Sequence, residues 1–220
     1  DSEDPDAIIS YDLKEGSDQN LSIDTVTGQV TLAVAPDFEN QESFVFIATA
    51  SDQAGNTSEQ LITLSVTNLD EVAPAITSGS VATAIDENSG AGQVIYTATA
   101  DDSADISGGV SFSLATGSDA ALSINSATGA VSLSADPDHE TQSSYSFTVV
   151  ATDAAGNASE GQAVTLSVND LDEAAPTITS GVFATAIDEN SGADQIIYTA
   201  TADDSADISG GVSFSLATGS

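Results

Sequence analysis

Short stretches in which hydrophobic and polar residues alternate recur along the chain. Residues 110–114 read VSFSL and residues 145–151 read YSFTVVA, with an apolar side chain at every second position. Successive side chains of a β-strand point to opposite faces, so a period of two is typical of strands with one buried face. Clusters of Gly, Asp, Asn and Ser lie between the stretches and favour turns. The pattern predicts an all-β fold.

Seven strands are expected between residues 74 and 175. They fall at residues 81–86, 92–100, 109–115, 121–125, 129–134, 143–152 and 161–169. Turn signals such as SATG at 126–129 and DAAGN at 153–157 separate them. Seven short strands in about 100 residues are typical of a β-sandwich domain.

The chain repeats itself. Residues 85–118 return as residues 187–220 with only two differences, Gly92 against Asp194 and Val94 against Ile196. An earlier landmark, PDFE at 36–39, returns 101 residues later as PDHE at 137–140. A period of this size indicates an array of whole domains, since the coils of a solenoid are much shorter.

Acidic hinges that end in proline mark the boundaries of the repeats. NLDEVAP at 68–74 returns as DLDEAAP at 170–176. Proline after a polar cluster is typical of a domain boundary. We therefore expect the later part of one repeat at 1–73, a complete repeat at 74–175 and the opening of a third at 176–220.

Charge narrows the range of partners. The chain has 35 Asp and Glu residues against one Lys or Arg, a formal net charge of -34. This balance argues against nucleic acid as a partner and against direct membrane contact, because phosphates and anionic headgroups repel it. No apolar run approaches the roughly 20 residues of a membrane span, and no signal peptide is recognisable. Cysteine is absent, which excludes disulfides and thiolate metal sites.

Many of the carboxylates recur at strand ends and hinges instead of on strand faces. Carboxylates a few ångströms apart repel one another unless a cation lies among them. Oxygen donors without Cys, in a chain with a single His, suit a hard cation. Calcium fits this donor set better than zinc or copper, and magnesium is the second choice.

Four acidic or polar motifs follow one another in the complete repeat. They are Glu87 and Asn88 in IDENSG, Asp138 and Glu140 in PDHE, Ala151 and Asp153 in ATDAAGN, and Asp170, Asp172, Glu173 and Pro176 in the hinge. Their order resembles the EN, DRE, AxD and DxNDNxP motifs of cadherin repeats, and more closely the cadherin-like repeats of large bacterial surface proteins. Val72 and Ala174 depart from the family's second linker Asn, and Asn68 departs from its first linker Asp.

The resemblance implies tandem seven-stranded Greek-key β-sandwiches, cadherin-like or immunoglobulin-like, with calcium at each junction. For the first junction it implies the ligands Asp37, Glu39, Asn68, Asp70, Glu71, Asp101, Asp102, Asp105 and Asp153. For the second junction it implies Glu87, Asp138, Glu140, Asp170, Asp172, Glu173, Asp203, Asp204 and Asp207. The family's DxD motif has no exact copy here. ADDSAD at 100–105 takes its place, so the choice among Asp101, Asp102 and Asp105 stays open.

The resemblance also implies an extracellular place on the cell surface. The expected function is a calcium-rigidified stalk of a giant bacterial adhesin, which holds a distal binding domain away from the cell for adhesion or biofilm formation. Its partners are the neighbouring repeats of the same chain and, through strand complementation, identical chains. A self-assembling surface filament and a homophilic or polysaccharide-binding module remain open as alternatives.

The acidic residues have two other interpretations. A salt-adapted surface would carry carboxylates that bind nothing in particular. Paired carboxylates also serve glycoside hydrolysis, but the sites repeat at linkers without nearby aromatic residues, and no catalytic motif is found. We therefore expect no enzyme. A lone His in a turn is typically solvated, so His139 is left out of the ligand set.

Overall fold

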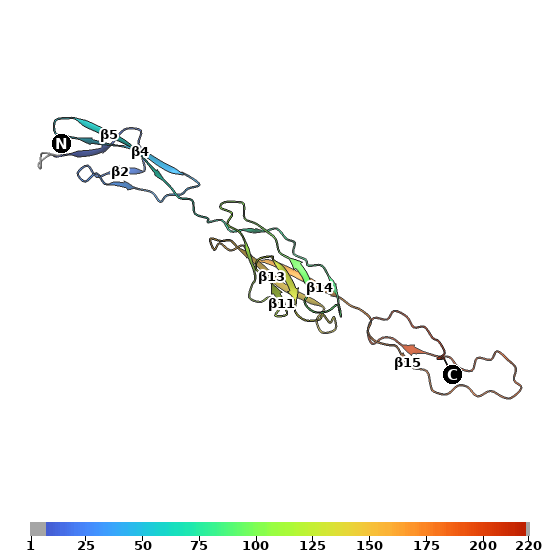
Figure 1. Ribbon diagram of the computed structural model, residues 1–220. Coiled ribbons are helices and arrows are strands. Elements are labelled where there is room, and N and C mark those ends of the chain that lie inside the picture. Colours follow the sequence, from blue (N-terminus) through green and yellow to red (C-terminus); the bar gives the residue numbers. More distant parts are fainter. Residues whose placement is uncertain (1–7, 219–220) are drawn as a thin grey trace. The chain divides into compact units, whose positions relative to one another are not determined.

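The computed structural model describes residues 8–218, and all of its regular secondary structure is β-strand (Figure 1). The chain divides into two compact units, unit 1 up to Glu71 and unit 2 from Val72 onward. Among the described residues no helix has the length and apolar character that crossing a membrane requires. The all-β prediction is confirmed.

Unit 1 contains a three-stranded sheet and a short hairpin. The sheet has the order β1–β4–β5, and the hairpin joins β2 to β3. These strands are β1 (Ser10–Leu13), β2 (Leu21–Ile23), β3 (Val30–Leu32), β4 (Ser43–Ser51) and β5 (Thr57–Ser65). Strands β4 and β5 pair antiparallel over their whole length, and Phe44 and Phe46 of β4 are buried.

Unit 2 contains two facing sheets that form a sandwich. One sheet has the order β10–β13–β14–β7, and the other has the order β11–β12–β8. These strands are β7 (Ile85–Asp86), β8 (Val94–Thr97), β10 (Ser111–Leu114), β11 (Leu122–Ile124), β12 (Ala130–Leu133), β13 (Ser144–Thr152) and β14 (Gln162–Asn169). Strand β7 pairs parallel with β14, while the other pairs in these sheets are antiparallel.

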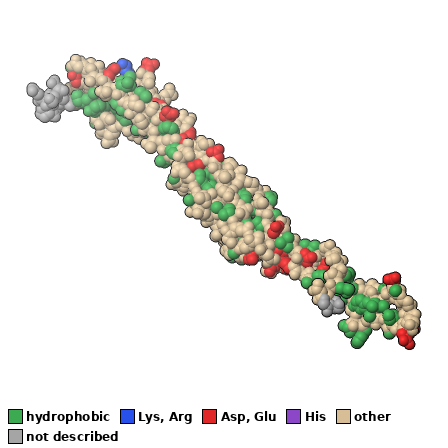
Figure 2. Space-filling view, turned by 45° about the vertical axis from the view of Figure 1, so that its right-hand side comes forward, with side chains coloured by type: hydrophobic (Ala, Val, Ile, Leu, Met, Phe, Trp, Pro, Cys, Tyr) green, Lys and Arg blue, Asp and Glu red, His purple; other side chains and the backbone are tan. Residues whose placement is uncertain are grey.

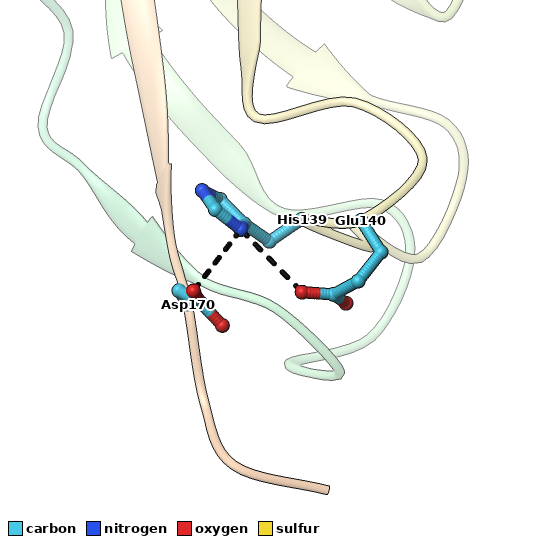
Figure 3. A group of neighbouring side chains, drawn as sticks. All are labelled: His139, Glu140 and Asp170. Carbon is cyan, nitrogen blue, oxygen red and sulfur yellow. Dashed lines mark ion pairs between the residues drawn. The ribbon is translucent and has the colours of Figure 1, made fainter. Parts of the chain in front are cut away.

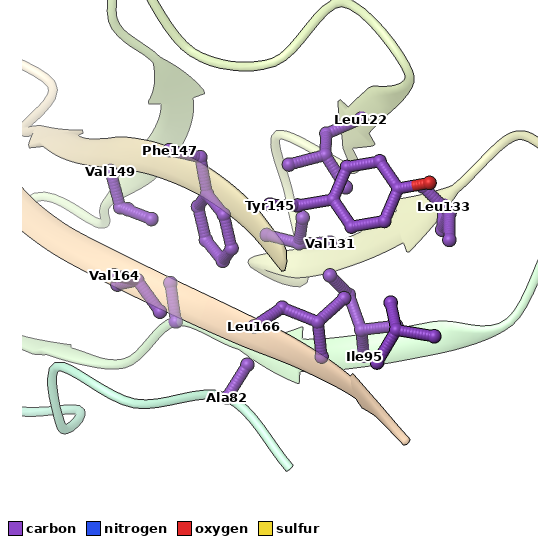
Figure 4. Close-up of a cluster of buried hydrophobic side chains, with 12 residues drawn as sticks. Ala82, Ile95, Leu122, Val131, Leu133, Tyr145, Phe147, Val149, Val164 and Leu166 are labelled. Atoms are coloured by element: carbon purple, nitrogen blue, oxygen red, sulfur yellow. The ribbon is translucent and has the colours of Figure 1, made fainter. Parts of the chain in front are cut away.

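The core of unit 2 lies between these sheets (Figure 4). Val131 and Leu133 come from one sheet, and Val149, Val164 and Leu166 come from the other; all five are at most 1% exposed. Buried and exposed residues alternate along β14, as the sequence pattern predicts. Burial of apolar side chains from both faces is the main stabilising contribution to such a fold.

Aromatic packing and a glycine turn complete this core. The rings of Tyr96 and Phe147 meet edge to face, with centroids 5.6 Å apart. Such a pair adds about 0.5–1.5 kcal/mol beyond its buried area. In the turn between β11 and β12, Gly129 has a φ of 69°, and a Cβ there would lie 2.4 Å from the carbonyl oxygen of Ala98. Only glycine allows this close approach.

Two short strand pairs open successive repeats at matched positions. Strand β6 (Ala75–Ile76) pairs with β9 (Ala100–Asp101), and β15 (Thr177–Ile178) pairs with β16 (Ala202–Asp203). The strand expected at 92–100 is therefore split between β8 and β9. The N–H groups of Thr77 and Ser78 both donate to the carbonyl of Thr99, which draws this end of the strand away from β12.

Candidate metal centre

Three segments meet where the complete repeat leads into the second hinge. They are the IDEN motif at the end of β7, the PDHE turn before β13 and the hinge residues after β14. The parallel pairing of β7 with β14 sets Ile85 opposite Val168 and Asp86 opposite Asn169. The amide of Asn169 donates to Asp86 Oδ1 at 2.8 Å, and the Glu87 N–H donates to the Asn169 carbonyl at 3.1 Å. The IDEN motif therefore lies beside the start of the hinge.

Glu87 is the buried anchor of this meeting point, with 1% of its surface exposed. Its Oε1 accepts a hydrogen bond of 2.5 Å from the Leu171 N–H, and its Oε2 accepts one of 2.7 Å from the His139 N–H. These two backbone donors, Leu171 first, lower the pKa of Glu87 despite its desolvation. The carboxylate is therefore ionised and ties the hinge to the PDHE turn.

The PDHE turn brings two more carboxylates to Glu87. Asp138 accepts hydrogen bonds from the Thr141 N–H at 2.8 Å and the Thr141 hydroxyl at 2.9 Å, which stabilise the turn. Glu87, Asp138 and Glu140 each offer an oxygen, and these three oxygens lie within 4.8 Å of one another. Two ligands of one calcium ion are at most about 5 Å apart, because each Ca–O distance is about 2.3–2.6 Å.

Glu140 also belongs to a second group of carboxylates. Glu140, Glu173 and Asp207 offer oxygens within 4.8 Å of one another. The Glu173 N–H donates to Asp207 Oδ2 at 3.0 Å, and the Asn88 amide donates to Glu173 Oε1 at 2.7 Å. Asn88 has a φ of 56°, a left-handed conformation that Asn tolerates. Glu140 therefore joins two adjacent groups.

The electrostatics of the second group favour a cation. The hydrogen bond from Asn88 lowers the pKa of Glu173, but desolvation, Asp207 and the charges of Glu87 and Glu140 outweigh it and raise that pKa. The pKa of Asp207 is lowered, chiefly by the N–H of Glu173. A pKa that neighbouring carboxylates raise records their mutual repulsion, which a divalent cation would relieve.

His139 and Asp170 lie beside Glu140 (Figure 3). The Nδ1 atom of His139 is 3.5 Å from Glu140 Oε1 and 3.4 Å from Asp170 Oδ2. The other oxygen of Asp170, Oδ1, is shielded from solvent and has no hydrogen-bond partner among the described residues. A shielded carboxylate oxygen without a donor is costly unless a cation binds it. These residues therefore fit a divalent cation, and their many oxygen donors fit calcium.

The remaining residues of the second predicted set lie outside these groups. Within residues 8–218, Asp172, Asp203 and Asp204 do not share a metal-sized group with the others. Asp203 ends β16, and its Oδ1 accepts a hydrogen bond from the Ser205 N–H at 3.0 Å. The hydrogen bonds from Ser205 lower the pKa of Asp203. The structure thus brings together six of the nine predicted residues, Glu87, Asp138, Glu140, Asp170, Glu173 and Asp207.

The predicted residues of the first set in unit 1 repeat part of this arrangement. Asp37 Oδ1 accepts a hydrogen bond of 3.1 Å from the Asn40 N–H, as Asp138 does from Thr141. Glu39 and Glu71 offer oxygens within 4.8 Å of each other. Asn68 and Asp70 lie in the hinge segment that follows β5.

The residues of the first set in unit 2 lie at the opening of the complete repeat and in its DAAGN turn. Asp101 ends β9 and accepts a hydrogen bond of 3.1 Å from the Ser103 N–H. Asp102 and Asp105 follow it in a loop, and Oδ2 of Asp102 is shielded without a hydrogen-bond partner in the described part of the chain.

Asp153 is the first residue of the DAAGN turn and is 6% exposed. Desolvation acts to raise its pKa, but hydrogen bonds from the side chain and N–H of Asn157 and from the Gly156 N–H lower it overall. Its two oxygens already accept these donors, so this carboxylate stabilises the turn whether or not it binds a cation.

Acidic side chains gather in groups on the face shown in Figure 2, and polar side chains and backbone cover most of the surface between them.

Sequence reasoning did not include two residues of the centre. Asn88 was matched to a motif but not expected to hold Glu173, and His139 was expected to be solvated. The position of His139 between two predicted ligands in PDHE was the available signal.

Two family patterns match the sequence. The cadherin domain matches residues 82–169, and a bacterial immunoglobulin-like domain matches residues 7–68. Among solved structures, three extracellular cadherin repeats of mouse Cadherin-23 (EC22-24) are similar with a TM-score of 0.57 and 26% identity, covering 90% of this chain and 68% of that one. Mouse Protocadherin-24 EC1-3 shares the fold, with a TM-score of 0.60 at 21% identity over 89% of this chain and 66% of that one.

Curated relatives are also cadherins. Mouse Protocadherin Fat 4 is 27% identical over 93% of this chain, and the Protocadherin-like wing polarity protein stan of Drosophila melanogaster is 25% identical over 85% of it. The chain spans 4% of the former and 6% of the latter. Rat Cadherin-4 is 31% identical over 85% of this chain and 70% of its own length. Cadherin domains are adhesion modules without enzymatic activity, as expected here. The chain belongs to the cadherin family.

Proposed function

We propose that the chain is a calcium-binding spacer of an extracellular surface protein. The observation that carries the proposal is the position of Glu140, whose oxygens lie near Glu87 and Asp138 and also near Glu173 and Asp207. These residues come from one repeat, the hinge that follows it and the opening of the next repeat. Cadherin domains bind calcium in general, which supports calcium as the cation.

Calcium would couple the hinge to the repeats on either side. The ligands proposed for the second junction are the six grouped carboxylates, with Asp172, Asp203 and Asp204 as further candidates. Bending the hinge would separate these charges from their cation, which makes bending unfavourable. Without calcium the same carboxylates repel one another, and the hinge becomes flexible. The first junction, with its matched residues, is proposed to work in the same way.

A bacterial cell surface is the proposed setting. The match of residues 7–68 to a bacterial immunoglobulin-like domain supports it. With the proposed bounds 1–73, 74–175 and 176–220, the second and third repeats are nearly identical over the residues that both contain, which suits a spacer whose length changes by duplication. Its partners would be neighbouring repeats, and its role would be to hold a distal binding domain of an adhesin away from the cell.

The hinge itself offers the direct test. In the double variant Asp172→Ala, Glu173→Ala we expect the calcium-dependent rise in melting temperature to be largely lost, while the melting temperature in chelator stays close to that of the wild type. The control, Glu42→Ala with Glu160→Ala, removes the same charge from exposed positions outside the groups. Equal calcium responses in both variants and the wild type would overturn the proposal.

A further inference from the structure

His139 adds a nitrogen donor to a centre that otherwise offers oxygen. Its ring, Glu140 and Asp170 each present a ligand atom, and these atoms lie within 4.8 Å of one another (Figure 3). We propose that these three residues form a binding site for a borderline divalent transition metal, of which Zn²⁺ is the type. The site lies wholly within the complete repeat and its hinge, between the PDHE turn and the residue that follows β14.

The separations between the three side chains suit shared coordination better than hydrogen bonding. Nδ1 lies 3.4 Å from Asp170 Oδ2 and 3.5 Å from Glu140 Oε1, whereas N–H···O hydrogen bonds are about 2.7–3.2 Å long. Two ligand atoms about 2.0–2.1 Å from a tetrahedral Zn²⁺ lie roughly 3.3–3.4 Å apart. Two of the three separations therefore already match those of ligands on one Zn²⁺ ion, and the third is at most 4.8 Å.

Asp170 also has an oxygen without a donor among the described residues, the atom other than the Oδ2 that faces His139. Its Oδ1 is shielded from solvent and accepts no hydrogen bond within the described part of the chain. Its place is set by the pairing of the preceding Asn169 with β7. A cation bound to the Asp170 carboxylate would compensate for the lost hydration of Oδ1.

The backbone of the PDHE turn, which carries His139, is also fixed by a hydrogen bond. The N–H of His139 donates to the buried Glu87 at 2.7 Å, which fixes the turn while the imidazole remains 29% exposed. The ring can therefore exchange ions with solvent without unfolding of the turn. A preorganised ligand set loses less conformational entropy on binding.

The donor set separates this site from a calcium site. Imidazole nitrogen suits zinc, cobalt and nickel, whereas calcium takes oxygen ligands. The matched motif in unit 1 has Phe38 in place of His139, and His139 is the only His in the chain. The two PDxE motifs thus provide an internal contrast, in which only the second can supply nitrogen.

The site shares Glu140 and Asp170 with the calcium ligands proposed above. Zinc and calcium would therefore compete for these carboxylates at the second junction. Only this competition rests on the proposed function, because zinc binding through His139 does not require calcium to bind. Zinc would act on one hinge and leave the other, with Phe38, unaffected.

The test uses the full 220-residue chain, stripped of metal by chelation and dialysis. Co²⁺ serves as a spectroscopic probe, because its visible d–d bands report tetrahedral coordination that includes nitrogen, and Zn²⁺ is then titrated by calorimetry. The variant His139→Phe copies the first motif, and His139→Gln provides a second variant if the first does not fold. The melting temperature with and without calcium is measured in parallel.

We expect the wild type to develop the Co²⁺ bands and to bind Zn²⁺, and both variants to lose at least about tenfold in Zn²⁺ affinity while keeping their calcium response. Excess calcium should weaken Zn²⁺ binding by the wild type. Unchanged Zn²⁺ affinity in the variants, or no Zn²⁺ binding beside a normal calcium response, would overturn the inference and leave the proposed function intact. Absence of a calcium response in the wild type would instead overturn the proposed function.

Discussion

The hairpin β4–β5 of unit 1 and the hairpin β13–β14 of unit 2 pair their matched residues in the same antiparallel way but differ in how far their side chains are buried. Leu64 lies opposite Phe44 in the first, and Leu166 lies opposite Tyr145 in the second. Leu166 is 0% exposed, whereas Leu64 is 43% exposed. Strand β7 extends the sheet beyond β14, and no strand pairs with the matching edge of β5 in the described part of unit 1. Alternation thus selects the inward face, and the depth of burial depends on the facing strands: Leu166 shares its core cluster with Ile95 of β8 and Val131 of β12.

Strand β7 also links the core of unit 2 to the candidate metal centre. Strand β7 closes the sheet beside β14, and the next residue, Glu87, is the buried carboxylate that receives two backbone donors. Pairing of one short strand therefore extends the sheet and positions the proposed ligand Glu87. Under the proposed function, stability and cation binding would be coupled in unit 2 through this segment.

The largest effect should come from truncating the two matched leucines. Leu166→Ala should lower the free energy of unfolding by about 2–5 kcal/mol, because it leaves a cavity in a packed core. Leu64→Ala should cost about 1 kcal/mol or less, because much of that side chain is already in water. Urea titrations in chelator, followed by NMR signals of the two hairpins, would measure both. Equal losses at the two positions would refute the contrast in burial.

An intermediate effect is expected at the two copies of the IDEN motif. Glu87→Gln should remove most of the calcium-dependent rise in melting temperature and lower the melting temperature in chelator. Its amide oxygen can replace only part of the carboxylate that accepts from Leu171 and His139. Glu189→Gln changes the same residue of the repeated motif, where the side chain is exposed, and should have little effect. A calcium response that survives Glu87→Gln would argue against Glu87 as a ligand.

The smallest effect concerns acid sensitivity of two matched turns. Asp24 Oδ1 accepts from the N–H groups of Val26 and Thr27, and Asn125 Oδ1 accepts from those of Ala127 and Thr128. The Thr27 and Val26 donors lower the pKa of Asp24 from 3.8. Its contribution to stability is therefore present above that value and is lost as the pH falls through the lower folded pKa.

Amide NMR shifts between about pH 5 and pH 2 would compare the two turns. The shifts of Val26 and Thr27 should titrate, those of Ala127 and Thr128 should not report a carboxylate in their own turn, and Asp24→Asn should abolish the difference. A titration of the first turn that persists in Asp24→Asn would show that another group is responsible.

Local patterns in the sequence predicted much of the fold. The long strands β13 and β14 were expected almost at their observed bounds, because alternation and turn residues both lie close in sequence. The division of residues 92–100 between β8 and β9 could not be predicted in this way, because it depends on hydrogen bonds from the distant Thr77 and Ser78.

The candidate centre was predictable to a similar degree. The repeated motifs identified the carboxylates, but periodicity carries no information on which oxygens approach one another. Glu140 lies in both carboxylate groups, and His139 lies against Asp170, because the turn before β13 packs beside the residues after β14. The antiparallel pairing of β13 with β14 sets these two segments side by side, and the pairing of β7 with β14 adds Glu87.

The most direct test of the central claim is a thermal melt with matched small-angle X-ray scattering. The full chain would be compared in chelator, in calcium and in magnesium at a fixed ionic strength. A calcium-specific rise in melting temperature, together with a longer and stiffer particle, is the predicted result. Identical melting and scattering in chelator and in calcium would contradict the account, and the carboxylates would then serve only as a soluble surface.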